Sequence, residues 1–211
     1  MDLQEIYEKT IAGDAPAVEE LVKRALDAGI RPSQIISHYL IPAMTEVGGR
    51  FERQEFYVPE MLIAARAMQR GLALLKPLLA EGEFQPVGEV VAGTVKGDLH
   101  DIGKNLVCMM LEGAGFVITD LGVDVEPEKF VAAVREHEPS IVAMSALLTT
   151  TMPGMQATIE ALIDAGLRGQ VKVMVGGAPV TEAYADQIGA DGYAPDAGAA
   201  VRKAKELLGI K

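Results

Sequence analysis

The residues best suited to chemistry lie in one short run, residues 97–103, with the sequence GDLHDIG. The neutral imidazole of a histidine is a good ligand for a transition metal, and its second nitrogen usually donates to a carboxylate. Asp98 stands two residues before His100, so a loop can bring that carboxylate to the ring. Gly103 follows three residues later, where the missing side chain would let a bulky group pass close to the backbone.

This run contains a single histidine, and no other histidine or cysteine supports it. A zinc site needs three or four protein ligands, so an ordinary zinc centre is not expected here. One histidine suffices if a macrocycle supplies the remaining ligands, which points to a tetrapyrrole-type cofactor. Taken alone, His100 could equally be a structural or helix-capping histidine, so the surrounding segments decide between the two interpretations.

The elements around this run alternate between short apolar stretches and amphipathic ones. Strands are expected near residues 90–95, 116–119, 141–145, 171–175 and 191–193, and helices near 101–113, 127–137, 155–165, 181–188 and 197–208. Such alternation predicts a parallel sheet with helices on both faces, in an α/β fold. Ligands of such sheets bind outside the carboxyl ends of the strands. Residues 97–103, 145–151 (SALLTTT) and 176–179 (GGAP) all follow strands and should therefore meet there.

The N-terminal part has helical periodicity instead. Four amphipathic helices are expected, at about residues 3–11, 14–29, from 32 onward and at 58–79, and they suggest a small bundle. Asp14 is positioned to cap the second helix, and Pro42 should kink or break the third. The linker is expected at residues 80–88, which gives two domains, 1–85 and 88–211.

Composition excludes several classes of protein. The chain of 211 residues carries 30 acidic and 19 basic residues, and its net charge of −11 argues against a nucleic-acid partner. No apolar stretch reaches the ~20 residues that a membrane helix needs, and the acidic N-terminus is unlike a signal peptide. Cys108 is the single cysteine, so no internal disulfide can form. We therefore expect a cytoplasmic protein without nucleic-acid or membrane partners.

Three motifs in order carry a family resemblance: D-x-H-x-x-G at residues 98–103, S-x-L at 145–147 and G-G at 176–177. Together they resemble the cobalamin-binding domain of the corrinoid proteins of methylotrophic methyltransferase systems, and the corresponding module of cobalamin-dependent methionine synthase. Residues 56–62 (FYVPEML) are similar to the helical cap over the upper face of the cofactor in that family. The resemblance implies a four-helix cap followed by a Rossmann-like, flavodoxin-like domain.

The resemblance also implies roles for individual residues. His100 would replace the dimethylbenzimidazole of a cobalamin or related corrinoid as the lower ligand to cobalt, Asp98 would hydrogen-bond His100, and Ser145 would extend that pair. The remaining expected cofactor contacts lie beside the histidine, along a slot for the nucleotide tail, and in the cap: Asp101, Ile102 and Gly103; Leu147, Thr149, Gly176, Gly177, Ala178, Tyr193 and Ala194; Tyr57 and Met61.

The implied function is that of a methyl carrier. The protein would take a methyl group from a donor-specific methyltransferase and pass it to an acceptor methyltransferase, cycling between Co(I) and methyl-Co(III), with a reductive activator as a further partner. Substrate activation would reside in the partners, because the cofactor performs the difficult chemistry and this protein positions it. Two alternatives stay open: a small subunit of an adenosylcobalamin-dependent mutase, and a cobalamin sensor. The donor is also open, among methylamines, methanol, betaines, aryl methyl ethers and methyl thiols.

Overall fold

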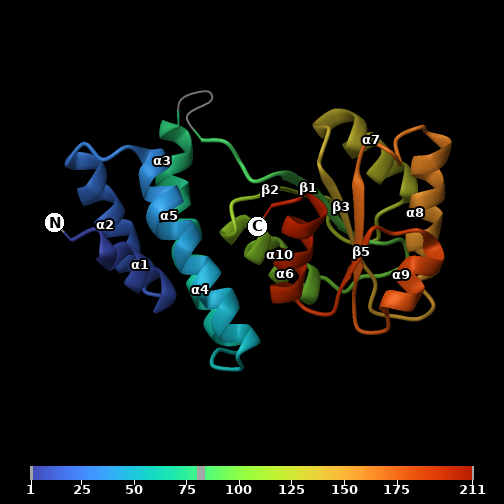
Figure 1. Cartoon of the computed structure of the whole chain (residues 1–211), viewed down its shortest axis with the longest axis horizontal. Helices are drawn as coiled ribbons and strands as arrows, with labels where there is room; N and C mark the ends of the chain where they lie inside the picture. The colour runs from blue at the N-terminus through green and yellow to red at the C-terminus, as the bar shows by residue number, and fades with distance from the viewer. Residues whose placement is uncertain (1, 80–83, 211) are drawn as a thin grey trace. The chain divides into compact units, whose positions relative to one another are not determined.

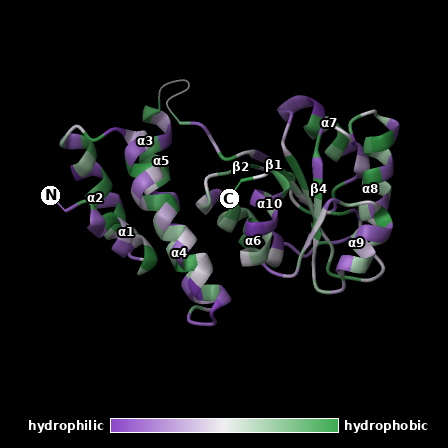
Figure 2. Cartoon of the chain, in the orientation of Figure 1, coloured by the Kyte–Doolittle hydropathy of each residue, from purple (hydrophilic) through white to green (hydrophobic). Residues whose placement is uncertain are grey.

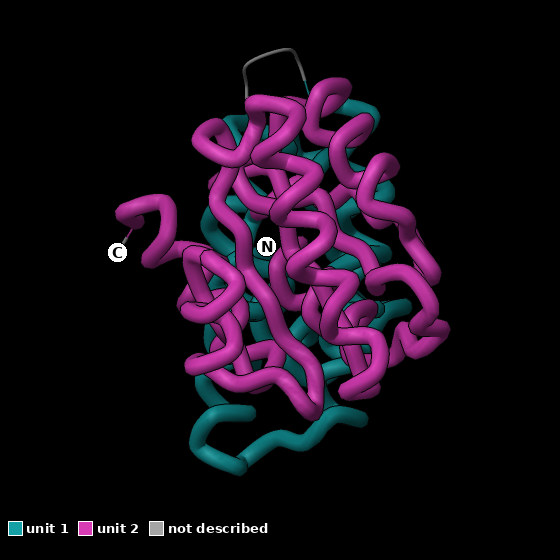
Figure 3. Tube along the Cα trace, turned by 90° about the vertical axis from the view of Figure 1, so that its right-hand side faces the viewer, with its two compact units in different colours: residues 1–86, 113–115 teal, residues 87–112, 116–211 magenta. Residues whose placement is uncertain are grey.

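A computed structural model describes residues 2–79 and 84–210 of the chain. The chain divides into two compact units: unit 1 holds residues 1–86 with 113–115, and unit 2 holds residues 87–112 with 116–211 (Figure 3). The linker predicted at residues 80–88 spans the point of division, and its residues 80–83 lie outside the described residues. No described helix is long and apolar enough to cross a membrane.

Unit 1 is helical, as predicted. Its α-helices are α1 (Gln4–Ile11), α2 (Ala15–Asp27), α3 (Pro32–Ile35), α4 (Ile41–Glu52) and α5 (Val58–Leu75), and a 3₁₀ turn, η2, covers Lys76–Leu78 (Figure 1). These helices carry both hydrophilic and hydrophobic residues, as Figure 2 shows, and most apolar side chains of α2 and α5 are buried, whereas Val58 and Ile63 of α5 are exposed. The predicted cap of α2 is confirmed, because the Asp14 carboxylate accepts the Ala17 N–H at 3.2 Å.

The chain stays helical through Pro42, where a kink or break was predicted. Between α3 and α4 lies one turn of π-helix, η1 (Ile36–Leu40). Proline has no N–H to donate, so a normal α-helical bond is lost at this point. In the wider turn the Ile41 N–H bonds the carbonyl of Ile36, five residues back. The π turn therefore carries the helix past the proline without ending it.

Unit 2 contains a five-stranded parallel sheet. Its strands are β1 (Glu89–Thr94), β2 (Val117–Asp120), β3 (Ile141–Ser145), β4 (Lys172–Gly176) and β5 (Gly192–Ala194), in the order β2-β1-β3-β4-β5. The helices are α6 (Ile102–Gly113), α7 (Pro127–His137), α8 (Pro153–Asp164), α9 (Glu182–Ile188) and α10 (Ala197–Leu207). This is the predicted flavodoxin-like arrangement. The strand order reverses between β1 and β3, where ligands of such sheets bind.

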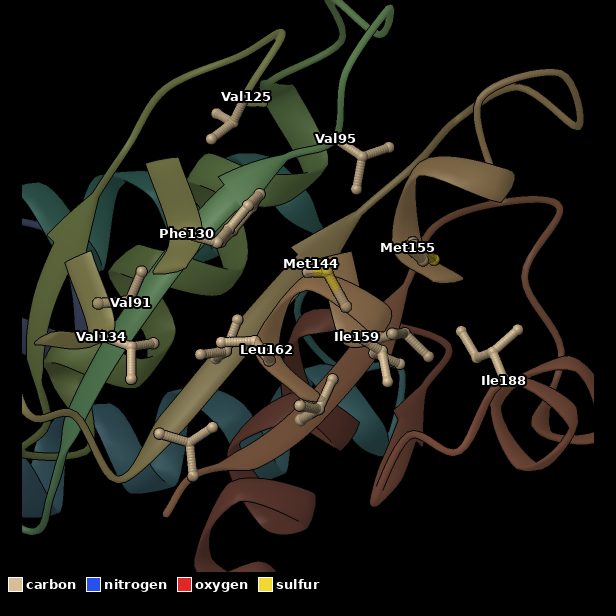
Figure 4. Close-up of a cluster of buried hydrophobic side chains, with 14 of the residues drawn as sticks. Val91, Val95, Val125, Phe130, Val134, Met144, Met155, Ile159, Leu162 and Ile188 are labelled. Atoms are coloured by element: carbon tan, nitrogen blue, oxygen red, sulfur yellow. The ribbon is translucent and has the colours of Figure 1, made fainter. Parts of the chain in front are cut away.

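Helices cover both faces of this sheet, with α6 and α10 on one side and α7, α8 and α9 on the other (Figure 1). Side chains alternate along β1, and Val91 and Val95 point into a buried cluster that contains Phe130 of α7 (Figure 4). Gly93 lies between them, and a Cβ at this position would approach the Phe130 ring to 2.7 Å. Thr94 points to the opposite face, toward the start of α6.

Candidate functional site

The loop between β1 and α6 carries the predicted histidine, and backbone hydrogen bonds hold its shape. Gly97 has a φ of +79°, which favours glycine, and its N–H donates to Oδ1 of Asp124 at 2.7 Å. The Asp124 N–H donates to the Asp98 carbonyl at 3.0 Å, and the Asp98 N–H donates to the Val95 carbonyl at 3.1 Å. The loop is therefore tied to the segment that follows β2.

Asp98 lies at the centre of the site. Its side chain is fully buried, and both of its oxygens accept two hydrogen bonds. Oδ1 accepts from the backbone N–H of His100 at 3.0 Å and pairs with Nδ1 of its ring at 2.7 Å. Oδ2 accepts from the Leu147 N–H and from the Thr151 hydroxyl, each at 2.7 Å. The carboxylate thus joins the loop after β1 to the loop after β3, across the point where the strand order reverses.

These hydrogen bonds determine the charge of Asp98. Burial by itself raises the pKa of this carboxyl, because it disfavours the charged form. The hydrogen bonds from Thr151, Leu147 and His100 act in the opposite direction, and together they hold the pKa well below its ordinary value. Asp98 is therefore an ionised acceptor at neutral pH. An acceptor at Nδ1 makes that nitrogen the protonated one and leaves the lone pair on Nε2.

The His100 ring faces outward with its Nε2 available. The side chain is 51% exposed, and no described residue is hydrogen-bonded to Nε2. Large apolar side chains are exposed in the same two loops and at the first residue of α6: Leu99, Leu147 and Leu148, and Ile102. A Cβ at Gly103 would meet no atom within 4 Å, so the space beside it is open, as predicted. An available imidazole nitrogen amid exposed apolar side chains would suit a metal carried by a large, flat, apolar ligand.

Within the described residues, no group of three or more histidine, cysteine or carboxylate side chains could hold a metal ion. That His100 is the single protein ligand of a metal whose other ligands come from a cofactor stays a prediction.

Thr151 occupies the place that was predicted for Ser145. The hydroxyl that extends the Asp98–His100 pair belongs to Thr151, and the hydrogen bonds of Asp98 do not include Ser145. Ser145 is the last residue of β3, and its carbonyl accepts the Val95 N–H. After β3 the chain turns, with a Thr151 N–H bond to the Leu148 carbonyl, and this turn brings Thr151 back over the carboxylate. The segment contains three adjacent threonines, and the sequence does not show which of them reaches the Asp98 carboxylate. The turn determines that it is Thr151.

The glycine pair at the end of β4 was predicted to leave space for a ligand, which stays a prediction, and the structure shows a further reason for it. Gly177 has a φ of +128°, and a Cβ there would lie 1.9 Å from the Ala146 carbonyl oxygen. A Cβ at Gly176 would lie 2.8 Å from the Ala194 carbonyl oxygen. The two glycines therefore let the ends of β3, β4 and β5 approach closely.

The other residues predicted to contact the nucleotide tail also lie at the carboxyl ends of the strands. Thr149 and Ala178 are exposed, Tyr193 is half-buried, and Ala194 is 7% exposed. The slot itself stays a prediction.

Two predicted contacts belong to unit 1. Tyr57 precedes α5, is 64% exposed, and donates its backbone N–H to the Glu60 carboxylate at 3.0 Å. Met61, one turn into the helix, has no exposed surface. The expected contacts of Tyr57 and Met61 with the cofactor stay predictions.

Lys104 is a buried residue of the site region that the sequence reasoning missed. Its Nζ bonds Oδ2 of Asp120, at the end of β2, and Oδ1 of Asn105 at 2.7 Å. The Asn105 amide in turn donates to Oδ2 of Asp101 at 3.1 Å. This chain of contacts fastens the first turn of α6 to the edge of the sheet. A lysine among apolar helix positions gives no sequence signal for such a pairing.

Comparisons with known proteins agree with this geometry. Two families, each described as a B12 binding domain, match residues 88–202 and residues 2–76. The dimethylamine corrinoid protein of Methanosarcina barkeri is 47% identical over 207 residues, which cover 98% of this chain and 97% of that protein. Trimethylamine corrinoid protein 2 of Methanosarcina acetivorans is 45% identical over 197 residues, 92% of this chain and 91% of that protein.

Solved structures are similar over nearly the whole chain. A chain of the methanol:cobalamin methyltransferase complex from Methanosarcina barkeri matches with a TM-score of 0.88 and 29% identity, over 97% of this chain and 78% of that one. A cobalamin-binding protein from Desulfitobacterium hafniense matches with a TM-score of 0.79 and 33% identity, over 98% of each chain. The predicted resemblance is confirmed, and the chain belongs to the family of B12-binding corrinoid proteins.

Proposed function

We propose that this protein is the methyl carrier of a corrinoid-dependent methyltransferase system. The observation that carries the proposal is the buried, ionised Asp98 bound to Nδ1 of a half-exposed His100, whose Nε2 is directed away from its protein partner. This pair lies in a chain that is 47% identical to a dimethylamine corrinoid protein over almost its entire length.

The residues present fit a corrinoid. A corrin ring supplies four nitrogen ligands to its cobalt, so the protein needs to add only one, and His100 offers one. The exposed side chains of Leu99, Ile102, Leu147 and Leu148 offer an apolar surface to a large ring, and the open space at Gly103 leaves room for it. When bound, the corrinoid supplies a cobalt atom that can accept a methyl group and release it again.

The chain's own residues hold the ligand and its proton. Asp98 keeps the proton on Nδ1 of His100, so that Nε2 presents its lone pair to the metal. The buried carboxylate also holds the ring in one orientation through this contact. Thr151 and the Leu147 N–H in turn hold that carboxylate in place.

Methyl donor and acceptor are selected elsewhere in this proposal. The relatives are named for dimethylamine and trimethylamine, and we infer that the donor here is a methylated amine. A donor-specific methyltransferase would deliver the methyl group, and a second methyltransferase would receive it. A reductive activator would reduce cobalt that has become oxidised. All three would act in the cytoplasm. The mutase-subunit and sensor alternatives lack support, since relatives covering 98% of the chain are corrinoid proteins.

The test is the ultraviolet–visible spectrum of the purified protein reconstituted with hydroxocobalamin. Wild type is compared with His100→Ala, and His137→Ala, an exposed histidine at the end of α7, serves as the matched control. We expect wild type and His137→Ala to retain the cofactor with the same spectrum, and His100→Ala to shift it. Reduction followed by a methylated amine and its methyltransferase should methylate the cofactor on the wild type. Failure to retain hydroxocobalamin, or identical spectra for wild type and His100→Ala, would contradict the proposal.

A further inference from the structure

Thr94, the last residue of β1, belongs to none of the three sequence motifs, yet it contacts the candidate metal ligand. Its side chain is fully buried, and its hydroxyl donates to the backbone carbonyl of His100 at 2.9 Å. Burying a hydroxyl is costly unless it is hydrogen-bonded, so a buried threonine with this one carbonyl partner has a defined position.

The sheet fixes Thr94 on both sides. In the register of β1 with β3 it lies opposite Ser145, and its N–H donates to the Gly122 carbonyl at 3.0 Å. The alternation of β1 sends Val95 into the core beside Phe130, so Thr94 points to the other face, where the chain turns into α6. The hydroxyl is therefore attached to a residue whose backbone is hydrogen-bonded and paired within the sheet.

His100 is consequently held at three points. Its carbonyl accepts from Thr94, its N–H donates to Oδ1 of Asp98 at 3.0 Å, and its ring Nδ1 pairs with the same oxygen at 2.7 Å. Asp98 holds the ring and the N–H of His100, but neither contact restrains rotation about its Cα–C bond, which turns the carbonyl and the chain that follows. The Thr94 hydroxyl restrains that remaining rotation.

We propose that Thr94 is a positioning residue that fixes the His100 backbone, so that Nε2 is already placed for cobalt before the corrinoid binds. This inference rests on the proposed function, because it takes His100 to be the axial ligand. A residue that pre-places a metal ligand shifts the equilibrium between the ligated and the released imidazole. Loss of one hydrogen bond of this kind should shift that equilibrium about fivefold, which is about 1 kcal/mol.

A matched control exists in the same unit. Thr158 of α8 is also fully buried, and its hydroxyl also donates to a backbone carbonyl, that of Gly154, at 2.8 Å. Thr158→Val therefore removes the same kind of hydrogen bond from the same kind of environment, with no contact to His100. Thr94→Ser restores the hydroxyl and serves as the conservative variant.

Electron paramagnetic resonance provides the readout. Each variant is labelled with nitrogen-15, reconstituted with hydroxocobalamin and reduced by one electron. A labelled protein nitrogen on cobalt splits the cobalt lines into doublets, whereas the unlabelled base of the cofactor splits them into triplets. In the cofactor-free protein, hydrogen exchange of the His100 amide reports the same anchoring independently.

We expect Thr94→Val to bind hydroxocobalamin but to lower the ratio of doublet-bearing to unligated cobalt about fivefold. The same variant should speed hydrogen exchange of the His100 amide. Thr94→Ser and Thr158→Val should give a ratio and an exchange rate near those of wild type. Equal loss in Thr158→Val, or a doublet fraction and exchange rate unchanged in Thr94→Val, would overturn the inference. A wild-type spectrum without doublets that matches His100→Ala would instead refute the proposed function. The two failures are therefore distinguishable.

Discussion

Replacing Thr151 by valine tests the geometry around Asp98 most directly. Valine keeps the shape of threonine but removes the hydroxyl that donates to the buried carboxylate at 2.7 Å. A hydroxyl has a single hydrogen, and although the Leu148 carbonyl lies 2.9 Å away, the charged carboxylate is the stronger acceptor.

The magnitude follows from the burial. A hydrogen bond to a charged group contributes about 1.5–3 kcal/mol, and a fully buried oxygen cannot recover it from water. The carboxylate keeps its three other donors, two from His100 and one from Leu147, so complete loss of the site is not expected. We therefore expect the free energy of unfolding of unit 2 to fall by about 2 kcal/mol.

The assay is native-state hydrogen exchange of the amides of β3, because this reports unit 2 separately from the helical unit. Two kcal/mol corresponds to exchange about thirtyfold faster at β3 in the most protected amides. Thr150→Val, on the exposed neighbour, is the matched control, and Thr151→Ser should restore protection. Exchange within about twofold of wild type in Thr151→Val would show that the hydroxyl does not stabilise the carboxylate, and the reasoning would then be wrong.

Two further predictions concern a glycine and the cysteine of unit 2. Gly177 has a φ of +128°, and a Cβ there would lie 1.9 Å from the Ala146 carbonyl oxygen, so Gly177→Ala should lower the free energy of unfolding by more than about 3 kcal/mol. Gly189 has a φ of +75° but open space around it, so Gly189→Ala should lower it by only about 1–2 kcal/mol. Equal melting temperatures for the two variants would contradict this. Burial raises the pKa of the Cys108 thiol from 9.0 to about 11, so its ionisation favours the unfolded chain: its contribution is fully present below pH 9 and lost as pH rises through about 11. Chemical denaturation between pH 8 and 11 should show about 2 kcal/mol lost in wild type beyond the loss in Cys108→Ala, and parallel curves would refute the assignment.

Much of the fold could be read from the sequence because its signals are local. The helical and strand periodicities predicted the five strands and the helices between them to within a few residues. The predicted ends of β3 and α7 are the same as those in the structure. Asp98 and His100 are two residues apart, so their pairing needed only one loop. Chain order then placed the candidate site, since parallel strands bring all their carboxyl ends to one edge of the sheet.

The identity of the supporting residues depended on tertiary structure. Thr151 lies 53 residues from Asp98, and it replaces the predicted Ser145 because the turn after β3 folds it back over the carboxylate. Thr94 reaches the His100 carbonyl because of the side-chain alternation of β1 and the path of the loop after it.

Gly177 is required by a carbonyl on a different strand end, and not by the chain on either side of it. Periodicity and motif spacing report what each residue faces within its own element. Hydrogen bonds and close approaches between strand ends depend on how separate elements meet, and for this protein only the folded chain specifies that.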